Sequence, residues 1–129
     1  MQARPEVIDL IKDYYTALEA NKPDAYGGYY AEDMTLTFGN SPTVHGRANV
    51  VASFGILGRV RSLRHDLLNI WEENGGQVII ECISHWRLPD DTLLSIPAMT
   101  IFTIDGGGKI TDQRIFVDNA PLAEALEVV

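Results

Sequence analysis

The hydrophobic pattern of the chain is mainly helical in its first half and typical of strands from Leu63 onward, and this order limits the folds it can adopt. From Pro5 to Ala20 the apolar residues recur every three or four positions, which predicts an amphipathic helix. The pattern predicts further helices over Pro23–Tyr30, where two glycines interrupt it, and over Gly46–Leu57. Between them, apolar and polar residues alternate over Met34–Phe38, which predicts a strand.

Everything from Leu63 to Asp118 reads as β-structure. The predicted strands cover Leu63–Glu72, Gln77–Leu88, Thr92–Ile104 and Lys109–Asp118, and short turns rich in Gly and Asp separate them. Such turns favour antiparallel hairpins. Helices followed by a meander predict an α+β fold in which three N-terminal helices cover a strongly curved, cone-shaped, antiparallel or mixed sheet. We expect one domain over residues 1–129, with a cavity between the helices and the concave face.

Composition excludes several classes of partner. The 129 residues carry 10 Lys and Arg against 18 Asp and Glu, a formal charge of −8, which disfavours nucleic acid and anionic membranes. Cys82 is the single cysteine, so no internal disulfide is possible. Three scattered histidines predict no metal site, and no cofactor motif is found, because Gly106–Gly108 precedes a strand. No apolar signal segment or spanning run is seen, so we expect a soluble, cytoplasmic protein.

Five short segments carry a resemblance to a known fold: Tyr14–Leu18, Tyr30–Asp33, His45–Arg47, Gly108–Ile110 and Arg114–Asp118. In this order the chain resembles the nuclear transport factor 2-like superfamily (cystatin-like α+β barrels) over its whole length. Within it, the SnoaL-like polyketide cyclases, the limonene epoxide hydrolases and the ketosteroid isomerases are the most similar groups. This fold hosts isomerases, dehydratases, cyclases, epoxide hydrolases and non-catalytic binders, so it does not fix a function.

Asp118 is the first candidate for catalysis. It follows two apolar residues at the end of the last predicted strand, where a carboxylate loses hydration and becomes a better base. The resemblance implies a catalytic carboxylate at this position, as in epoxide hydrolases and SnoaL-like cyclases. The alternative is that Asp118 caps the following turn or a helix over Pro121–Leu126.

Tyr14 is the second candidate. The chain resembles the ketosteroid isomerases at this residue, where those enzymes carry the phenol that stabilises an oxyanion. Their general base would fall on Phe38 and their second donor near Met99 or Thr100, so the standard isomerase mechanism is not expected. Tyr14 either points into the cavity and donates to a substrate oxygen or is a core aromatic with a satisfied hydroxyl.

The limonene epoxide hydrolase mechanism is not expected either. Alignment on the turn that begins at Arg87 places Cys82 and Ser84 where those enzymes carry Arg and Asp. Leu36 and Phe38 stand where they carry the Tyr and Asn that hold water. Water could not be held and deprotonated by these side chains.

His65 and Asp33 complete the catalytic candidates, because dehydratase-like members of the fold use a cavity His with an Asp and a Tyr. Alternation places His65 on the same face as Trp71. If that face is concave, His65 is a proton carrier; otherwise it is a surface residue paired with Asp66 or Asp33. Asp33 stands where some dehydratases carry an acid or base, or it belongs to a turn.

We expect a largely apolar wall around the substrate. Its large side chains are Phe38, Trp71, Trp86, Met99 and Phe116, and its two small residues are Cys82 and Ser84. Cys82 is expected to act as a small buried hydrophobe. Apolar residues on the outer sheet face, namely Ile79, Ile83, Leu94 and Ile96, predict a homodimer through that face.

The predicted function is a cofactor-independent acid/base enzyme of the lyase or isomerase type. Its substrate would be a small hydrophobic molecule, cyclic or polyketide-like, that undergoes cyclisation, dehydration or isomerisation. The alternative is a non-catalytic binding or carrier protein for a hydrophobic small molecule.

Overall fold

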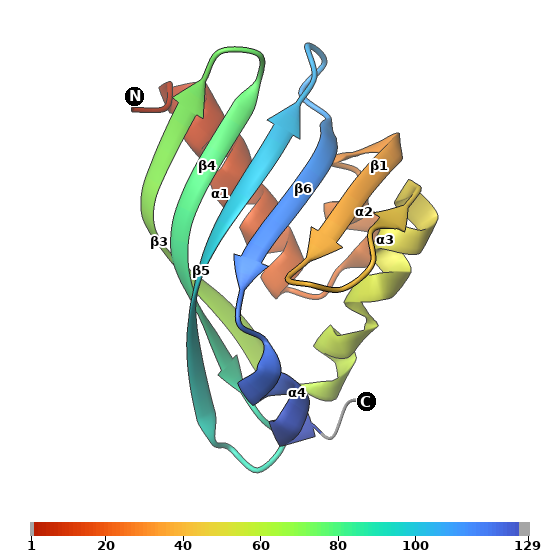
Figure 1. The fold of residues 1–129 in the computed structure, drawn as a ribbon, viewed down its shortest axis with the longest axis vertical. Helices are drawn as coiled ribbons and strands as arrows, with labels where there is room; N and C mark the ends of the chain where they lie inside the picture. Colours follow the sequence, from red (N-terminus) through yellow and green to blue (C-terminus); the bar gives the residue numbers. More distant parts are fainter. Residues whose placement is uncertain (1, 127–129) are drawn as a thin grey trace.

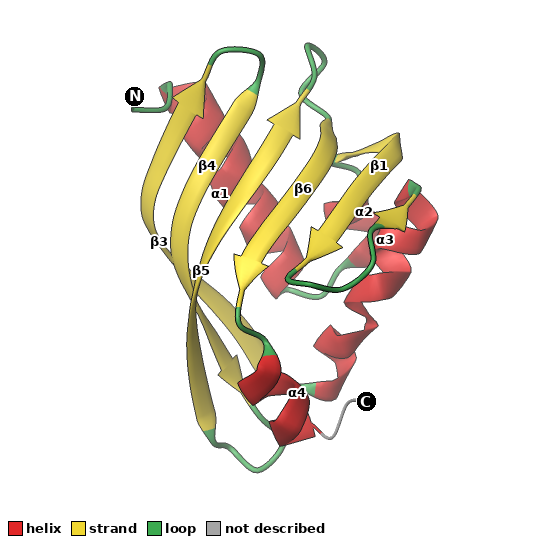
Figure 2. Ribbon diagram, viewed as in Figure 1, coloured by secondary structure: helices red, strands yellow, loops and turns green. Residues whose placement is uncertain are grey.

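The computed structural model describes residues 2–126; residue 1 and residues 127–129 of the predicted domain lie outside the described residues. The N-terminal part contains α1 (Pro5–Glu19), α2 (Pro23–Gly27), β1 (Tyr30–Phe38), β2 (Val44–His45), α3 (Arg47–Ser53) and the 3-10 helix η1 (Phe54–Arg59). The rest contains β3 (Ser62–Glu73), β4 (Gln77–Arg87), β5 (Leu93–Ile104), β6 (Ile110–Val117) and α4 (Ala120–Leu126). Figure 2 shows that the helices and strands form separate layers. The predicted α+β class is confirmed.

The strands form one mixed, open sheet in the order β2-β1-β6-β5-β4-β3. Only β1 and β6 pair in parallel. β1 precedes the meander of β3 to β6 in the sequence, and it lies beside β6, the last strand of that meander. The other neighbours are antiparallel hairpins, as the short turns predict. In Figure 1 the sheet bends strongly along β3, β4 and β5, α1 lies across its concave face, and α4 lies at its lower end.

The core forms where α1 meets the concave face. Ile11, Tyr14, Tyr15 and Leu18 are buried at helical spacing. The Tyr14 ring contacts the ring of Phe102 edge to face, with centroids 5.7 Å apart. The predicted helix over Pro5–Ala20 is therefore confirmed to within one residue.

Two predicted helices have different limits in the structure. The second ends at Gly27, and Tyr30 already belongs to β1, because the glycine pair has a low helix propensity and the Tyr29 carbonyl accepts the Ile110 N–H. The third begins after Gly46, whose φ of 90° requires glycine. It changes to a 3-10 helix at Phe54.

No helix within residues 2–126 is both long and apolar enough to cross a lipid bilayer.

Candidate functional site

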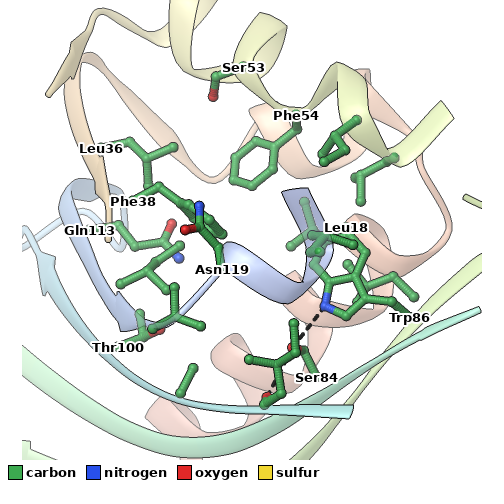
Figure 3. A pocket seen from close by; sticks show the side chains of 18 of the residues that line it. Leu18, Leu36, Phe38, Ser53, Phe54, Ser84, Trp86, Thr100, Gln113 and Asn119 are labelled. Carbon is green, nitrogen blue, oxygen red and sulfur yellow. Dashed lines mark hydrogen bonds between the residues drawn. The ribbon is translucent and has the colours of Figure 1, made fainter. Parts of the chain in front are cut away.

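A cavity of about 360 Å³ lies between the concave face of the sheet, α1, η1 and α4 (Figure 3). Each of the strands from β3 to β6 contributes alternate residues to its wall, because successive side chains of a strand point to opposite faces. Its hydrocarbon wall includes Leu18, Leu36, Phe38, Phe54, Ile56, Leu57, Leu63, Trp86, Ile96, Ala98, Ile115, Val117 and Leu122. Such a cavity suits a small ligand that is largely apolar.

The polar groups of the wall are few and carry no carboxylate or Lys or Arg among the described residues. They are Tyr15, Ser41, Ser53, His65, Cys82, Ser84, Thr100, Gln113 and Asn119. Figure 3 shows Gln113, Asn119 and Thr100 reaching into the cavity from β5, β6 and the turn that follows β6. The site therefore presents neutral hydrogen-bonding groups and one imidazole.

His65 is held by Glu19, the last residue of α1. One carboxylate oxygen, Glu19 Oε2, lies 2.9 Å from His65 Nδ1 and accepts the His65 backbone N–H at 2.7 Å. Because a carboxylate oxygen accepts, Nδ1 carries the proton of the neutral ring. Nε2 has no hydrogen-bond partner within residues 2–126, and no sealed side-chain N or O atom in that range lacks a partner. Nε2 is therefore not fully buried, and the imidazole that carries it forms part of the cavity wall.

Tyr15 packs against His65 in the cavity wall. Their ring centroids are 4.5 Å apart, so the phenol ring limits the movement of the imidazole. Burial raises the pKa of Tyr15 far above its usual value, and its interaction with the Thr100 side chain only partly opposes this shift. Tyr15 is thus a neutral hydroxyl at any physiological pH.

Gln113 connects the cavity to a buried pair of tyrosines. Its Oε1 lies 3.3 Å from the Tyr14 hydroxyl, which lies 2.6 Å from the Tyr30 hydroxyl. Gln113 is only 2% exposed and both tyrosines are fully buried. These contacts fix the side chain that β6 directs into the cavity.

Ser84 and Trp86 form a second hydrogen-bonded unit in the wall. The Trp86 indole donates to Ser84 Oγ at 2.9 Å, and Ser84 Oγ donates to the Ile96 carbonyl at 3.1 Å (dashed lines in Figure 3). The Ser84 hydroxyl is therefore fully used within the protein. It orients the indole and is not free to attack a substrate.

The structure brings five of the sequence-predicted site residues to the cavity. His65, Phe38, Cys82, Ser84 and Trp86 all form its wall. Burial raises the pKa of the Cys82 thiol to about 11, which agrees with a small hydrophobe rather than a nucleophile.

Asp118 does not point into the cavity, and the prediction that it does is wrong. Its side chain is exposed, and Oδ1 accepts the backbone N–H of Ala120 at 3.1 Å, at the start of α4. The preceding Val117 and the following Asn119 both line the cavity, so alternation directs residue 118 to the other side. The capping alternative is the correct one.

Tyr14 and Asp33 also lie outside the cavity wall. Tyr14 is a core aromatic whose hydroxyl is satisfied by Tyr30 and Gln113, as the second alternative stated. Asp33 is exposed on β1, because the adjacent Met34 occupies the buried face. His65 is paired neither with Asp33 nor with Asp66 but with Glu19.

Trp71 was expected to share the face of His65, and a β-bulge makes this prediction wrong. The pairing of β3 with β4 shifts between Leu67 and Asn69, so that Leu68 is an extra residue. After the bulge Ile70 is buried and Trp71 turns to the convex face, where it is half-buried.

Met99 and Phe116 were expected in the cavity and lie on the convex face instead. They are opposite each other on β5 and β6, and their neighbours Thr100 and Ile115 point inward. Conversely Ile96, expected outside, lines the cavity, and Leu94 is paired with the inward Trp86. The wall residues predicted on β4 line the cavity, whereas those predicted on β5 and β6 lie on the opposite face of the sheet.

Sequence reasoning missed Glu19, Tyr15, Gln113 and Asn119. Tyr15 lies one turn before Leu18 on the apolar face of α1, a signal that the sequence contains. Gln113 lies on the same face of β6 as the apolar residues Ile115 and Val117, and a polar residue among apolar ones on that face is a usable signal. Glu19 looked like a solvated helix residue, and nothing local distinguishes it. Within residues 2–126, no three His, Cys, Asp or Glu side chains gather into a metal-binding group.

Comparison with protein families decides the identity of the domain. Residues 11–113 match the SnoaL-like domain family. This chain belongs to the SnoaL-like family. The resemblance predicted from the five sequence segments is thereby confirmed, and the search of curated proteins found no match.

Solved structures share the architecture of this SnoaL-like domain. A candidate SnoaL-like polyketide cyclase from Shewanella denitrificans has a TM-score of 0.79 at 18% identity, with 98% of this chain and 100% of that chain covered. SalBIII, an epoxide hydrolase/cyclase-like enzyme of pyran ring formation in salinomycin, has 0.80 at 20% identity, with 92% and 95% covered. A protein with a ketosteroid isomerase-like fold from Catenulispora acidiphila has a TM-score of 0.79 at 17% identity, with 98% of this chain and 96% of that chain covered. These identities establish the common fold alone.

Proposed function

We propose that this SnoaL-like domain is a cofactor-independent enzyme that moves a proton on a small, largely apolar molecule held in the cavity. The reaction is of the cyclase, dehydratase or isomerase type, and the substrate is cyclic or polyketide-like. The single observation that supports it best is the Glu19–His65 pair, in which Nδ1 is held at 2.9 Å while the ring lines the cavity and its Nε2 has no partner within residues 2–126. His65 thus replaces Asp118 as the proposed proton-transfer residue.

The pair has the features that a general base requires. Glu19 fixes the ring tautomer, so the lone pair of Nε2 is available, and the carboxylate stabilises the imidazolium that forms after proton uptake. The His65 side chain is 11% exposed, and Tyr15 packs on its ring. The apolar wall keeps water from competing for the proton.

A second candidate function is supported by the same wall. No carboxylate lines the cavity among the described residues, and most of the lining is hydrocarbon. Both features suit a carrier that holds a hydrophobic molecule without changing it. The two functions differ in whether His65 exchanges a proton with the ligand.

Hydrogen–deuterium exchange into a bound carbon acid distinguishes them. The wild-type protein is incubated in D2O with 4-phenylcyclohexanone or phenylacetonitrile, and loss of the acidic C–H signal is followed by NMR. We expect catalysed exchange that falls about 10²-fold or more in His65→Gln, the range of general base catalysis. Glu19→Gln should fall less, because the ring remains but its orientation and charge partner are lost.

His85→Gln is the matched control. His85 is also bonded to a carboxylate, with Nε2 2.9 Å from Asp66 Oδ2, but it lies on the convex face. Its replacement should leave the exchange rate unchanged. Exchange that persists in His65→Gln contradicts the assignment of His65, and binding of both probes without exchange in the wild type favours the carrier.

A further inference from the structure

A chain of three buried polar side chains ends at the cavity. Tyr30 and Tyr14 are joined through their hydroxyls at 2.6 Å, and the Tyr14 hydroxyl lies 3.3 Å from Gln113 Oε1. An amide oxygen only accepts, so Tyr14 donates to Gln113 and Tyr30 donates to Tyr14. The direction of every hydrogen bond in the chain is therefore set.

This direction determines which end of the Gln113 amide meets a ligand. Oε1 is used by Tyr14, so Nε2 with its two N–H groups is the end left for the cavity, whose wall Gln113 forms. Nε2 has no hydrogen-bond partner within residues 2–126, although the residue is only 2% exposed. Because no fully buried side-chain N or O atom within residues 2–126 lacks a partner, the small exposed part of Gln113 includes Nε2, which is therefore free to donate to a ligand oxygen at the cavity wall.

We propose that Gln113 Nε2 binds the carbonyl oxygen of a neutral ligand in the cavity, and that Tyr14 and Tyr30 are positioning residues for it. The occupant is neutral because the described lining contains no Lys or Arg to balance a carboxylate, and the chain has a formal charge of −8. An amide N–H is a neutral donor that suits a carbonyl. The inference rests on the proposed function only in placing the ligand in the same cavity.

Both tyrosines keep their role as donors over the whole physiological range. Burial raises the pKa of Tyr14 and of Tyr30 far above the usual value for a phenol. Neither hydroxyl therefore loses its proton, and the orientation of the Gln113 amide does not depend on pH. The amide is held before the ligand arrives, which reduces the entropy lost on binding.

The assignment also gives Gln113 a part in the proposed proton transfer. When His65 Nε2 takes a proton from the carbon next to a carbonyl, the C–H electron pair forms a C=C bond and the C=O π pair moves to oxygen. The enolate oxygen is then stabilised by the Gln113 N–H. Return of the proton from His65 to a carbon of the enolate completes an isomerisation without any other reactant.

Paired ligands test the binding claim apart from any turnover. Quenching of Trp86, which lies in the wall, measures the Kd of 4-phenylcyclohexanone and of phenylcyclohexane, which lacks the carbonyl. We expect the wild type to bind the ketone roughly tenfold more tightly than the hydrocarbon, about 1.4 kcal/mol. Gln113→Leu should abolish this preference, and Tyr14→Phe should reduce it because the amide is no longer held.

Infrared spectra of the bound ketone give a readout that a merely structural role would not move. The C=O stretch should lie at lower frequency in the wild type than in Tyr14→Phe, which keeps the assay valid if Gln113→Leu does not fold. Gln77→Leu, an exposed glutamine at the start of β4, is the matched control and should change neither preference nor stretch.

His65→Gln separates this proposal from the proposed function. It should keep the preference for the ketone even though proton exchange is lost. Equal binding of the two ligands by the wild type, a preference that survives in Gln113→Leu, or a stretch unchanged in Tyr14→Phe overturns the proposal. None of these results depends on whether exchange is observed.

Discussion

Replacement of Ser84 by alanine removes a hydroxyl that serves two partners in the cavity wall. Ser84 Oγ accepts the Trp86 indole N–H at 2.9 Å and donates to the Ile96 carbonyl at 3.1 Å. Ser84 and Trp86 are each only 7% exposed. Ser84 Oγ is the only hydrogen-bond partner of the Trp86 indole N–H within residues 2–126, so Ser84→Ala removes that partner.

The cost follows from these contacts. One net hydrogen bond contributes about 1 kcal/mol, and an indole donor left unsatisfied raises the loss to roughly 1–3 kcal/mol. A chain of 129 residues has an unfolding entropy at which 1 kcal/mol corresponds to about 4 °C in Tm. We expect Ser84→Ala to lower Tm by at least that amount.

A double-mutant cycle isolates the Ser84–Trp86 interaction. Ser84→Ala, Trp86→Phe and the double variant are unfolded in urea and followed by far-ultraviolet circular dichroism. We expect the double variant to be about 1 kcal/mol more stable than the sum of the single effects predicts, since Trp86→Phe removes the stranded donor. Additivity within about 0.3 kcal/mol would refute the reasoning, because the two side chains would then be energetically independent.

Three other predictions follow from the placement of side chains. Asp118→Ala should lower the free energy of unfolding in urea by about 0.5–1 kcal/mol, because the hydrogen bond from the Ala120 N–H is lost. Asp118→Asn, which keeps a good capping side chain, should change neither stability nor proton exchange. Loss of proton exchange in Asp118→Asn would show that the carboxylate takes part in the reaction. Cys82, whose pKa is raised to about 11, should react slowly with iodoacetamide at pH 8 and faster as the pH rises toward 11, measured by mass spectrometry. We also propose a dimer through the convex face, where Met99 and Phe116 are 37% and 53% exposed; light scattering should show it in the wild type and monomers in Phe116→Lys.

The sequence was sufficient for the architecture because the architecture depends on period. The helical spacing of α1 and the Gly and Asp turns between β3, β4, β5 and β6 are local signals. The boundary errors occur where two local preferences compete, as at Gly27, where helix propensity fails and the pairing of β1 with β6 takes over. The parallel contact of these strands joins residues far apart in the sequence, which no local pattern specifies.

The site was harder to predict because it depends on which face of the sheet each side chain occupies, and one extra residue in a strand reverses that face. The bulge at Leu68 reverses the face of every residue that follows it on β3. His65 and Trp71 are six residues apart, an even number that would place them on the same face of a regular strand, and the bulge places them on opposite faces. The sequence carries no Gly or Pro at this point to mark the bulge. The contact of Glu19 with His65 joins a helix end to a strand, and it requires the packed fold to be known.

The alternation of side chains along β6 also explains why Asp118 points away from the cavity. Gln113, Ile115 and Val117 point inward along β6, and the pairing of β5 with β6 is regular from Ala98 to Thr103. An acid directed into the cavity at position 118 would require a bulge near the end of β6, and the register shows none there. The only inward polar side chain on β6 is Gln113, a neutral amide. We therefore propose that a proton would be transferred from the side of α1 and β3, where Glu19 holds His65, and that β6 would hold the substrate oxygen through Gln113.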